Sequence, residues 1–208
     1  MPPGKLAAVV THLEMTAPVP LRRESAVAGF DLRRVAEPEI GWYRELYARV
    51  GGPYLWAWRL AQSDEALRAL LRDPLIENYV LCAGVAEEGL LELDFRTAGE
   101  CEIIYFGVTQ AFVGTGAARF MMNRALERAW SQPIRRLWLH TCTLDHPRAV
   151  PFYVRSGFRP FKREIEIFDD PRALGSLPLE TAPDVPFFAT APDVPILEAA
   201  PDAPICQT

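Results

Sequence analysis

The stretch Ile103-Ile-Tyr-Phe-Gly-Val-Thr-Gln-Ala-Phe-Val-Gly-Thr-Gly-Ala-Ala118 joins an apolar run to a loop with two glycines. A nearly continuous apolar run, here Ile103 to Val108, is typical of a central strand covered on both faces. The apolar residues that follow recur with helical spacing, at Ala118, Met121, Met122, Ala125, Leu126 and Ala129. The stretch therefore predicts a buried strand, a loop and an amphipathic helix, in that order.

The loop has the composition of a phosphate-binding turn. Gly114 and Gly116 let the backbone approach a ligand closely, and the first N–H groups of the next helix have no helical acceptor. The same glycines also suit a tight turn that binds nothing, and by themselves they favour neither interpretation. A Walker A loop is excluded because no Gly-Lys-Ser/Thr follows, and Arg119 stands where a dinucleotide-binding fingerprint needs its third glycine.

Strands and helices are mixed on both sides of this stretch. The patterns predict strands over residues 9–15 and 30–35, helices over 39–50 and 63–71, a hairpin of 78–86 with 90–96, a strand over 136–142, a helix over 148–156 and a last strand over 161–168. Ser63 is the expected N-cap of the second helix, and the hairpin turn is expected at Glu87-Glu88-Gly89. The order is that of an α/β (α+β) domain.

Charge and composition limit the classes of partner. Of the 27 acids, five lie in residues 176–208, which leaves 22 acids against 22 bases in the rest of the chain. Such a neutral body offers no basic field, so we expect no nucleic-acid or membrane partner. The apolar runs fall short of the ~20 residues of a membrane span and no secretory signal is evident, which predicts a soluble, cytoplasmic protein. The four cysteines have no CxxC spacing, so no metal site is expected.

The C-terminal segment repeats itself every nine residues, as Ala182-Pro-Asp-Val-Pro186, Ala191-Pro-Asp-Val-Pro195 and Ala200-Pro-Asp-Ala-Pro204. Each unit carries two prolines, which remove backbone donors and fix φ. We therefore expect a domain over residues 1–175 followed by an extended or disordered tail over 176–208. A solvated appendage fits this composition, whereas Phe187 and Phe188 keep docking onto the domain open.

Two motifs resemble those of the GNAT N-acetyltransferase superfamily. Its phosphate-binding motif, Gln/Arg-x-x-Gly-x-Gly/Ala after a strand that ends in Val, is matched by Val113-Gly-Thr-Gly-Ala-Ala118 after Val108. Its downstream pattern, Asn-x-x-Ala-x-x-hydrophobic-Tyr and then Gly-Phe, is matched by His146-Pro-Arg-Ala-Val-Pro-Phe-Tyr153 and then Gly157-Phe158. Each motif departs only at its first position. The clear resemblance covers residues 80–168.

The resemblance implies the GNAT fold: a central mixed, mostly antiparallel, twisted sheet flanked by about four helices, with acetyl-CoA at a splay between the two central strands. It implies that the pyrophosphate of CoA is bound by the backbone of Val113, Gly114, Thr115, Gly116, Ala117 and Ala118, and its pantetheine arm by Phe106, Gly107 and Val108. His146 would lie near the start of its helix, where Pro147 and Pro151 leave its contact with the co-substrate open.

Acetyl transfer from a thioester needs an unprotonated amine, a stabilised oxyanion and a proton for the leaving thiolate. The resemblance implies that Tyr153 is the general acid and that the N–H of Val108 stabilises the oxyanion. Glu102 matches the glutamate base of histone-type members, and strict strand alternation places it on one face with Ile104, Phe106 and Val108. Glu102 also fits a solvated strand start, and Glu92, Asp94 or a water chain remain alternative bases.

The implied activity is transfer of acetyl from acetyl-CoA to a primary amine of a small molecule, by direct attack in a ternary complex. Aromatic residues between Trp42 and Trp58 lie where GNAT proteins build the wall on the acceptor side, which favours a closed pocket. Acetylation of a protein or peptide amine, and a catalytically silent acyl-CoA-binding module, remain alternatives. A homodimer is plausible because GNAT sheets often pair.

Overall fold

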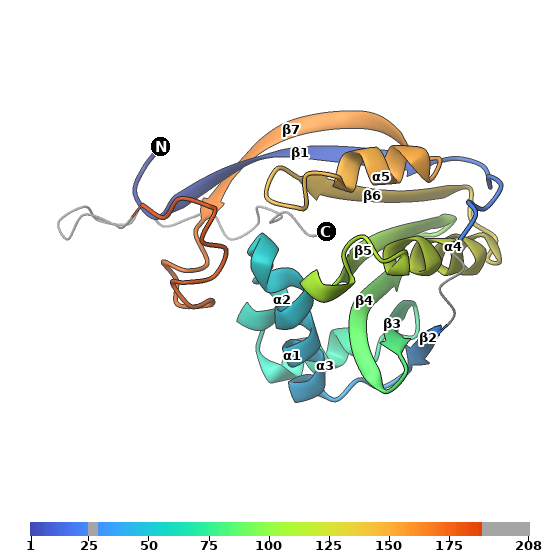
Figure 1. The fold of residues 1–208 in the computed structure, drawn as a ribbon, viewed down its shortest axis with the longest axis horizontal. Coiled ribbons are helices and arrows are strands. Elements are labelled where there is room, and N and C mark those ends of the chain that lie inside the picture. Colours follow the sequence, from blue (N-terminus) through green and yellow to red (C-terminus); the bar gives the residue numbers. More distant parts are fainter. Residues whose placement is uncertain (25–28, 189–208) are drawn as a thin grey trace.

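The computed structural model describes residues 1–24 and 29–188. Within them, one seven-stranded sheet has the order β2-β3-β4-β5-β6-β1-β7 (Figure 1). The strands are β1 (Lys5–Met15), β2 (Phe30–Val35), β3 (Ile76–Ala83), β4 (Ala86–Asp94), β5 (Glu100–Val108), β6 (Arg136–Cys142) and β7 (Arg159–Asp169). Neighbouring strands are antiparallel except β5 and β6, which are parallel. The predicted mixed, mostly antiparallel sheet is confirmed.

The helices in the described part of the chain are α1 (Ile40–Gly51), α2 (Trp58–Ala61), α3 (Asp64–Leu71), α4 (Ala117–Trp130) and α5 (Ala149–Arg155), with 3-10 turns η1 (Gly52–Tyr54) and η2 (Gln110–Phe112). Helix starts follow local chemistry, since the side chain of Ser63 accepts from the N–H of Ala66 at 3.2 Å, as predicted. In the same way, Glu39 accepts from Trp42 at the start of α1.

The sheet separates two apolar cores. On one face α1 and α3 pack on the central strands through residues such as Tyr43, Leu46 and Leu67. On the other face α4 buries Met121, Met122, Ala125, Leu126 and Ala129, which is the helical face that the spacing predicted. Helix α5 lies on the same side as α4, because its Tyr153 belongs to that core.

Strands β5 and β6 separate along their length. Their ladder joins only Glu100–Glu102 to Arg136–Trp138, although β5 continues to Val108. Just after the end of β5, the N–H of Thr109 donates to the carbonyl of Glu88 in β4. Because antiparallel residues alternate in the direction of their N–H groups, the N–H of Val108 points away from β4, into the gap. The predicted splay between the two central strands is confirmed.

The hairpin turn predicted at Glu87-Glu88-Gly89 is wrong. Strands β3 and β4 turn at Gly84 and Val85, and Gly84 has the positive φ, 63°, that a tight hairpin turn requires. Gly89 lies inside β4 for a different reason, since a Cβ there would lie 2.9 Å from the carbonyl oxygen of Gly107. Close packing, and not a turn, therefore requires glycine at this position.

The strict alternation predicted for β5 is also wrong. Glu92 pairs with Tyr105 but Leu93 pairs with Ile103, so Ile104 is an extra residue in a β-bulge. Ile104 and Tyr105 both belong to the core beneath α1, whereas Phe106 and Val108 belong to the core beneath α4. Glu102 therefore shares a face with Ile104 and not with Phe106 and Val108.

The predicted tail begins at Ser176, and its first part lies within the described residues. Leu177 and Ala182 are buried in a small cluster with Leu6 and Leu55. The second and third repeat units lie outside the described residues, and the domain boundary after residue 175 stays a prediction. None of the helices in residues 1–24 and 29–188 is long and apolar enough to cross a membrane.

Candidate active site

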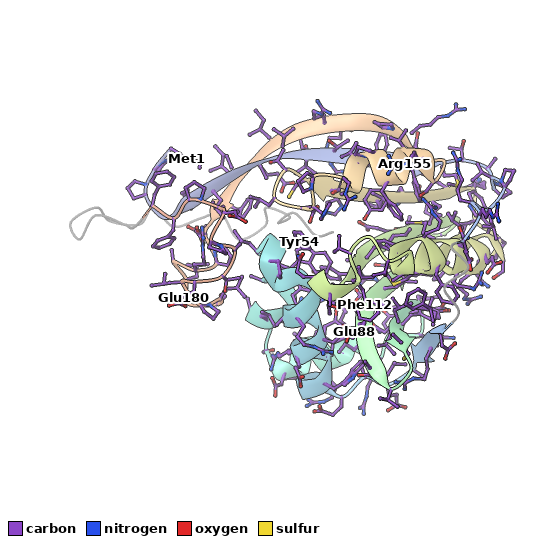
Figure 2. The ribbon with its side chains drawn as sticks, viewed as in Figure 1. Met1, Tyr54, Glu88, Phe112, Arg155 and Glu180 are labelled. Atoms are coloured by element: carbon purple, nitrogen blue, oxygen red, sulfur yellow. The ribbon has the colours of Figure 1, made fainter. Side chains whose placement is uncertain are left out.

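A cavity of about 250 Å³ opens at the splay. Nine of the residues singled out from the sequence line it: Phe106, Gly107, Val108, Val113, Gly114, Gly116, Ala118, His146 and Tyr153. Thr115, Ala117 and Glu102 do not line it. Tyr54, labelled in Figure 2, adds part of the wall on the side of α1, and its hydroxyl accepts from Nε2 of Gln110 at 3.0 Å.

The glycine loop presents backbone to this cavity. Gly114 and Gly116 have φ of 83° and 98°, and a Cβ on Gly114 would meet no atom within 4 Å. The hydroxyl of Thr115 donates to the carbonyl of Phe112 at 2.8 Å, so this side chain holds the loop together. Ala117, the first residue of α4, is buried. The loop therefore combines open backbone with an internally fixed shape, which suits an anion at a helix start.

Arginine side chains make this end of the cavity basic. Arg119, Arg148 and Arg155 line it, and the guanidinium of Arg119 lies over the ring of Phe152 at 4.6 Å. Burial, with the nearby charges of Arg22 and Arg155, lowers the pKa of Arg119. Its buried Nη1 has no hydrogen-bond partner among the residues that the structure describes. A partly buried cation whose buried nitrogen has no partner is suited to a phosphate.

Tyr153 is buried on α5 and packs edge-on against the rings of Phe106 and Phe158, with centroids 6.0 and 6.2 Å away. Burial, and to a smaller extent the charge of Asp145, raises the pKa of the Tyr153 hydroxyl far above its usual value. The hydroxyl therefore stays protonated throughout the neutral range. It can donate a proton, but it cannot serve as a base.

Asp145 is the cavity carboxylate that sequence reasoning missed. Its Oδ1 accepts from the indole of Trp56 at 3.2 Å, and its Oδ2 accepts from the hydroxyl of Thr141 at 2.6 Å and the N–H of Cys142 at 2.9 Å. Burial, partly opposed by these hydrogen bonds, raises the pKa of Asp145 from 3.8 to about 6. An aspartate between a strand end and the His146 motif was the available sequence signal.

Comparison with known proteins agrees with this geometry. Residues 38–158, more than half of the chain, match the model of the acetyltransferase (GNAT) family. This chain belongs to the GNAT acetyltransferase family. Mycothiol acetyltransferase from Jonesia denitrificans is 34% identical over 77 residues, which are 37% of this chain and 24% of that protein. The match therefore spans about a quarter of that relative's length.

Solved structures of GNAT proteins share the fold. A GCN5-related N-acetyltransferase from Sphaerobacter thermophilus has a TM-score of 0.61 at 16% identity, covering 78% of this chain and 52% of that one. An aminoglycoside acetyltransferase from an uncultured soil metagenomic sample, in complex with trehalose, has a TM-score of 0.54 at 13% identity, covering 64% of this chain and 90% of that one. At these identities the likeness establishes the fold and nothing further.

The three carboxylates considered as bases from the sequence of this GNAT enzyme lie outside the cavity. Glu92 is fully buried, pairs with Arg59 and accepts from the hydroxyl of Tyr43 at 2.8 Å. Asp94 is held by the guanidinium of Arg96 at 2.6 Å. Glu102 lies where β5 and β6 are still paired, with its Oε1 3.4 Å from Nδ1 of His140.

His146 has a structural contact in the position where GNAT proteins commonly carry Asn. Its Nδ1 accepts from the N–H of Arg148 at 3.1 Å, just before α5 begins. Burial and the charge of Arg148 lower the pKa of His146, so the ring is neutral at pH 7. The described residues hold no group of three or more His, Cys, Asp or Glu that could bind a metal.

Proposed function

We propose that this GNAT acetyltransferase binds acetyl-CoA in the cavity at the splay and transfers the acetyl group to a primary amine of a small molecule. One observation carries the proposal: a single cavity joins the glycine loop, the unpaired guanidinium of Arg119, the end of β5 and the hydroxyl of Tyr153. These are the groups that an acyl-CoA and its leaving thiolate require.

The residues around the cavity fit the co-substrate. The open backbone of Gly114, the backbone of Gly116, the first N–H groups of α4 and the side chain of Arg119 would hold the pyrophosphate. The edge of β5 from Phe106 to Val108 lacks a strand partner on the side of β6 and would hold the pantetheine arm. Bound acetyl-CoA would supply the activated acetyl thioester.

Different groups of the protein would stabilise the oxyanion and protonate the leaving thiolate. The N–H of Val108 faces the gap and would stabilise the oxyanion, because a backbone donor fixed in a strand needs no reorganisation. Tyr153, kept protonated by burial, would donate the proton that the leaving thiolate needs. Attack by the amine then proceeds directly within the ternary complex.

Asp145 is the carboxylate best placed to accept the proton of the amine. It lines the same cavity as Tyr153, and a pKa of about 6 makes it a stronger base than an exposed aspartate. Glu102 remains the alternative base, and it would need a water chain to reach the cavity. The aromatic wall of Tyr54 and Trp56 supports a small amine over an extended peptide.

The test follows release of free thiol from acetyl-CoA with a panel of polyamines, amino acids, aminoglycosides, arylamines and peptides. We expect one class of small amine to be acetylated, and Tyr153→Phe to lower kcat by about 10²-fold or more while the Kd of acetyl-CoA is kept. Tyr79→Phe is the matched control, because that buried hydroxyl donates to Glu77 and lies outside the cavity.

Three other results would change the assignment. Turnover with peptides alone would identify a peptide acetyltransferase. Binding of acetyl-CoA without turnover of any amine would identify a silent binding module. Absence of acetyl-CoA binding would refute the proposed site altogether.

A further inference from the structure

A second cavity, of about 610 Å³, lies between α1, η1 and the C-terminal segment. Gly52, Pro53 and Tyr54 form one side, and residues 181–185, which include most of the first repeat unit, form part of the other. Tyr54 and His146 line both this cavity and the one at the splay. The second cavity therefore adjoins the cavity at the splay where Tyr54 and His146 lie.

The C-terminal wall of this cavity is anchored to the domain. The guanidinium of Arg172 forms a buried ion pair with Asp170 at 2.7 Å. The same group donates to the carbonyl of Thr181 at 3.2 Å and to that of Val185 at 2.9 Å. Ala182, between them, is 7% exposed. The buried guanidinium thus donates hydrogen bonds to carbonyls of the first repeat unit and fixes this segment as part of the cavity wall.

Strained backbone is found at the same place. Leu55 and Ala182, with φ of 61° and 50°, are the non-glycine residues with positive φ in the described part of the chain. Both belong to the buried cluster behind the second cavity. Positive φ costs a residue with a Cβ on the order of 1 kcal/mol, and such strain gathers at ligand sites. The packing that holds Leu55 against Ala182 therefore also sets the shape of the cavity.

The two cavities differ in charge. Among the described residues that line the second cavity, Asp184 is the only Asp, Glu, Lys or Arg. Its remaining lining is apolar or neutral, and burial keeps His146 uncharged at neutral pH. The cavity at the splay instead carries three arginines, Arg119, Arg148 and Arg155, against the one carboxylate of Asp145. An anionic ligand suits the first cavity, and a cationic ligand with an apolar part suits the second.

We propose that the first repeat unit forms the outer wall of the acceptor site, and that the carboxylate of Asp184 selects a primary amine carried as a cation on a partly apolar body. This inference rests on the proposed function, to which it adds the substrate class and the segment that recognises it. The amine would lie in the second cavity with its nitrogen toward Tyr54 and His146, where the two cavities meet.

The repeat itself supplies a matched control. Thr181-Ala-Pro-Asp-Val-Pro186 and Thr190-Ala-Pro-Asp-Val-Pro195 are identical in sequence, so Asp184→Asn and Asp193→Asn make the same chemical change in the same local context. With phenethylamine as the cationic probe in the full chain, we expect Asp184→Asn to raise KM by about threefold to tenfold. We expect kcat and the Kd of acetyl-CoA to be unchanged, and Asp193→Asn to match the parent protein. Equal values of KM for the two variants would overturn the assignment of Asp184.

A binding measurement separates this inference from the proposed function. N,N-dimethylphenethylamine is a cation that cannot be acetylated, and its affinity can be measured by calorimetry without turnover. Weaker binding to Asp184→Asn than to Asp193→Asn would support the site even if no amine were acetylated. Absence of binding to the parent protein would overturn it, whatever the result with acetyl-CoA.

Blocking the cavity gives a second, independent test. Thr181→Cys places a thiol in the wall, and Thr190→Cys is its counterpart in the second repeat unit. After treatment with N-ethylmaleimide, we expect Thr181→Cys to lose acetylation of amines while it still binds acetyl-CoA, and Thr190→Cys to keep both. Full amine turnover by labelled Thr181→Cys would overturn the proposal, because the label would occupy the site assigned to the acceptor.

Discussion

Replacement of Asp145 by asparagine tests both the burial of this carboxyl and its role as a base. Burial raises the pKa of Asp145 from 3.8 to about 6. At about 1.4 kcal/mol per pH unit, this shift corresponds to about 3 kcal/mol of stability. Because the folded-state pKa is raised, that stability is fully present below pH 3.8 and is lost as the pH rises through about 6.

The assay is denaturant unfolding of the parent protein and Asp145→Asn over a series of pH values. Asparagine does not titrate, so we expect the parent to lose up to about 3 kcal/mol relative to the variant between about pH 4 and pH 7. Groups common to both proteins cancel in this difference. The amide oxygen can accept from both Thr141 and Cys142 in place of Oδ2, but the amide NH2 then replaces Oδ1 and cannot accept from the indole of Trp56. That loss of about 1 kcal/mol does not depend on pH.

The pH profile of kcat/KM then tests the catalytic role. We expect the profile to rise with an apparent pKa near 6 in the parent and in Glu102→Gln, and to lose this limb in Asp145→Asn. A stability difference that is constant between about pH 4 and pH 7 would refute the burial argument. A limb that survives in Asp145→Asn and disappears in Glu102→Gln would assign the base to Glu102.

Three further substitutions test the packing around the site. Gly107→Ala would place a Cβ 3.2 Å from the ring of Trp56 and closer still to a side chain of the core beneath α1. We expect the free energy of unfolding, measured by urea denaturation, to fall by about 1–3 kcal/mol. The Cβ of Gly114→Ala would meet no other atom, but the alanine would have to adopt a φ of 83°, which costs about 1 kcal/mol of strain. We therefore expect calorimetry to show a several-fold weaker affinity for acetyl-CoA. Arg59→Met leaves the buried carboxylate of Glu92 without its cation, which should lower the free energy of unfolding, measured by heat or denaturant, by about 3–5 kcal/mol. The double variant with Glu92→Leu should recover most of this loss.

The central strand, the glycine loop and α4 could be predicted because their signals are local. A continuous apolar run, a pair of glycines and a helical spacing lie within residues 103–129 and depend little on the rest of the chain. The same stretch also located seven of the residues that line the cavity, and the downstream motif added His146 and Tyr153. The orientation of Glu102 failed because a bulge is a property of two strands, and no feature of β5 alone marks Ile104 as the extra residue.

Asp145 and the C-terminal wall depend on contacts between segments that are distant in sequence. The proton affinity of Asp145 is raised by burial and partly lowered by hydrogen bonds, one of which comes from Trp56, 89 residues away in the chain. The first repeat unit has the composition of a solvated tail, yet one arginine just after β7 binds its carbonyls and brings it against the domain. The composition of a segment predicts its conformation only in the absence of tertiary contacts. Here the residue that makes those contacts, the arginine, lies outside the repeat. A low-complexity tail should therefore be judged together with any buried arginine that precedes it, since such a cation can satisfy the carbonyls that proline-rich backbone leaves unpaired.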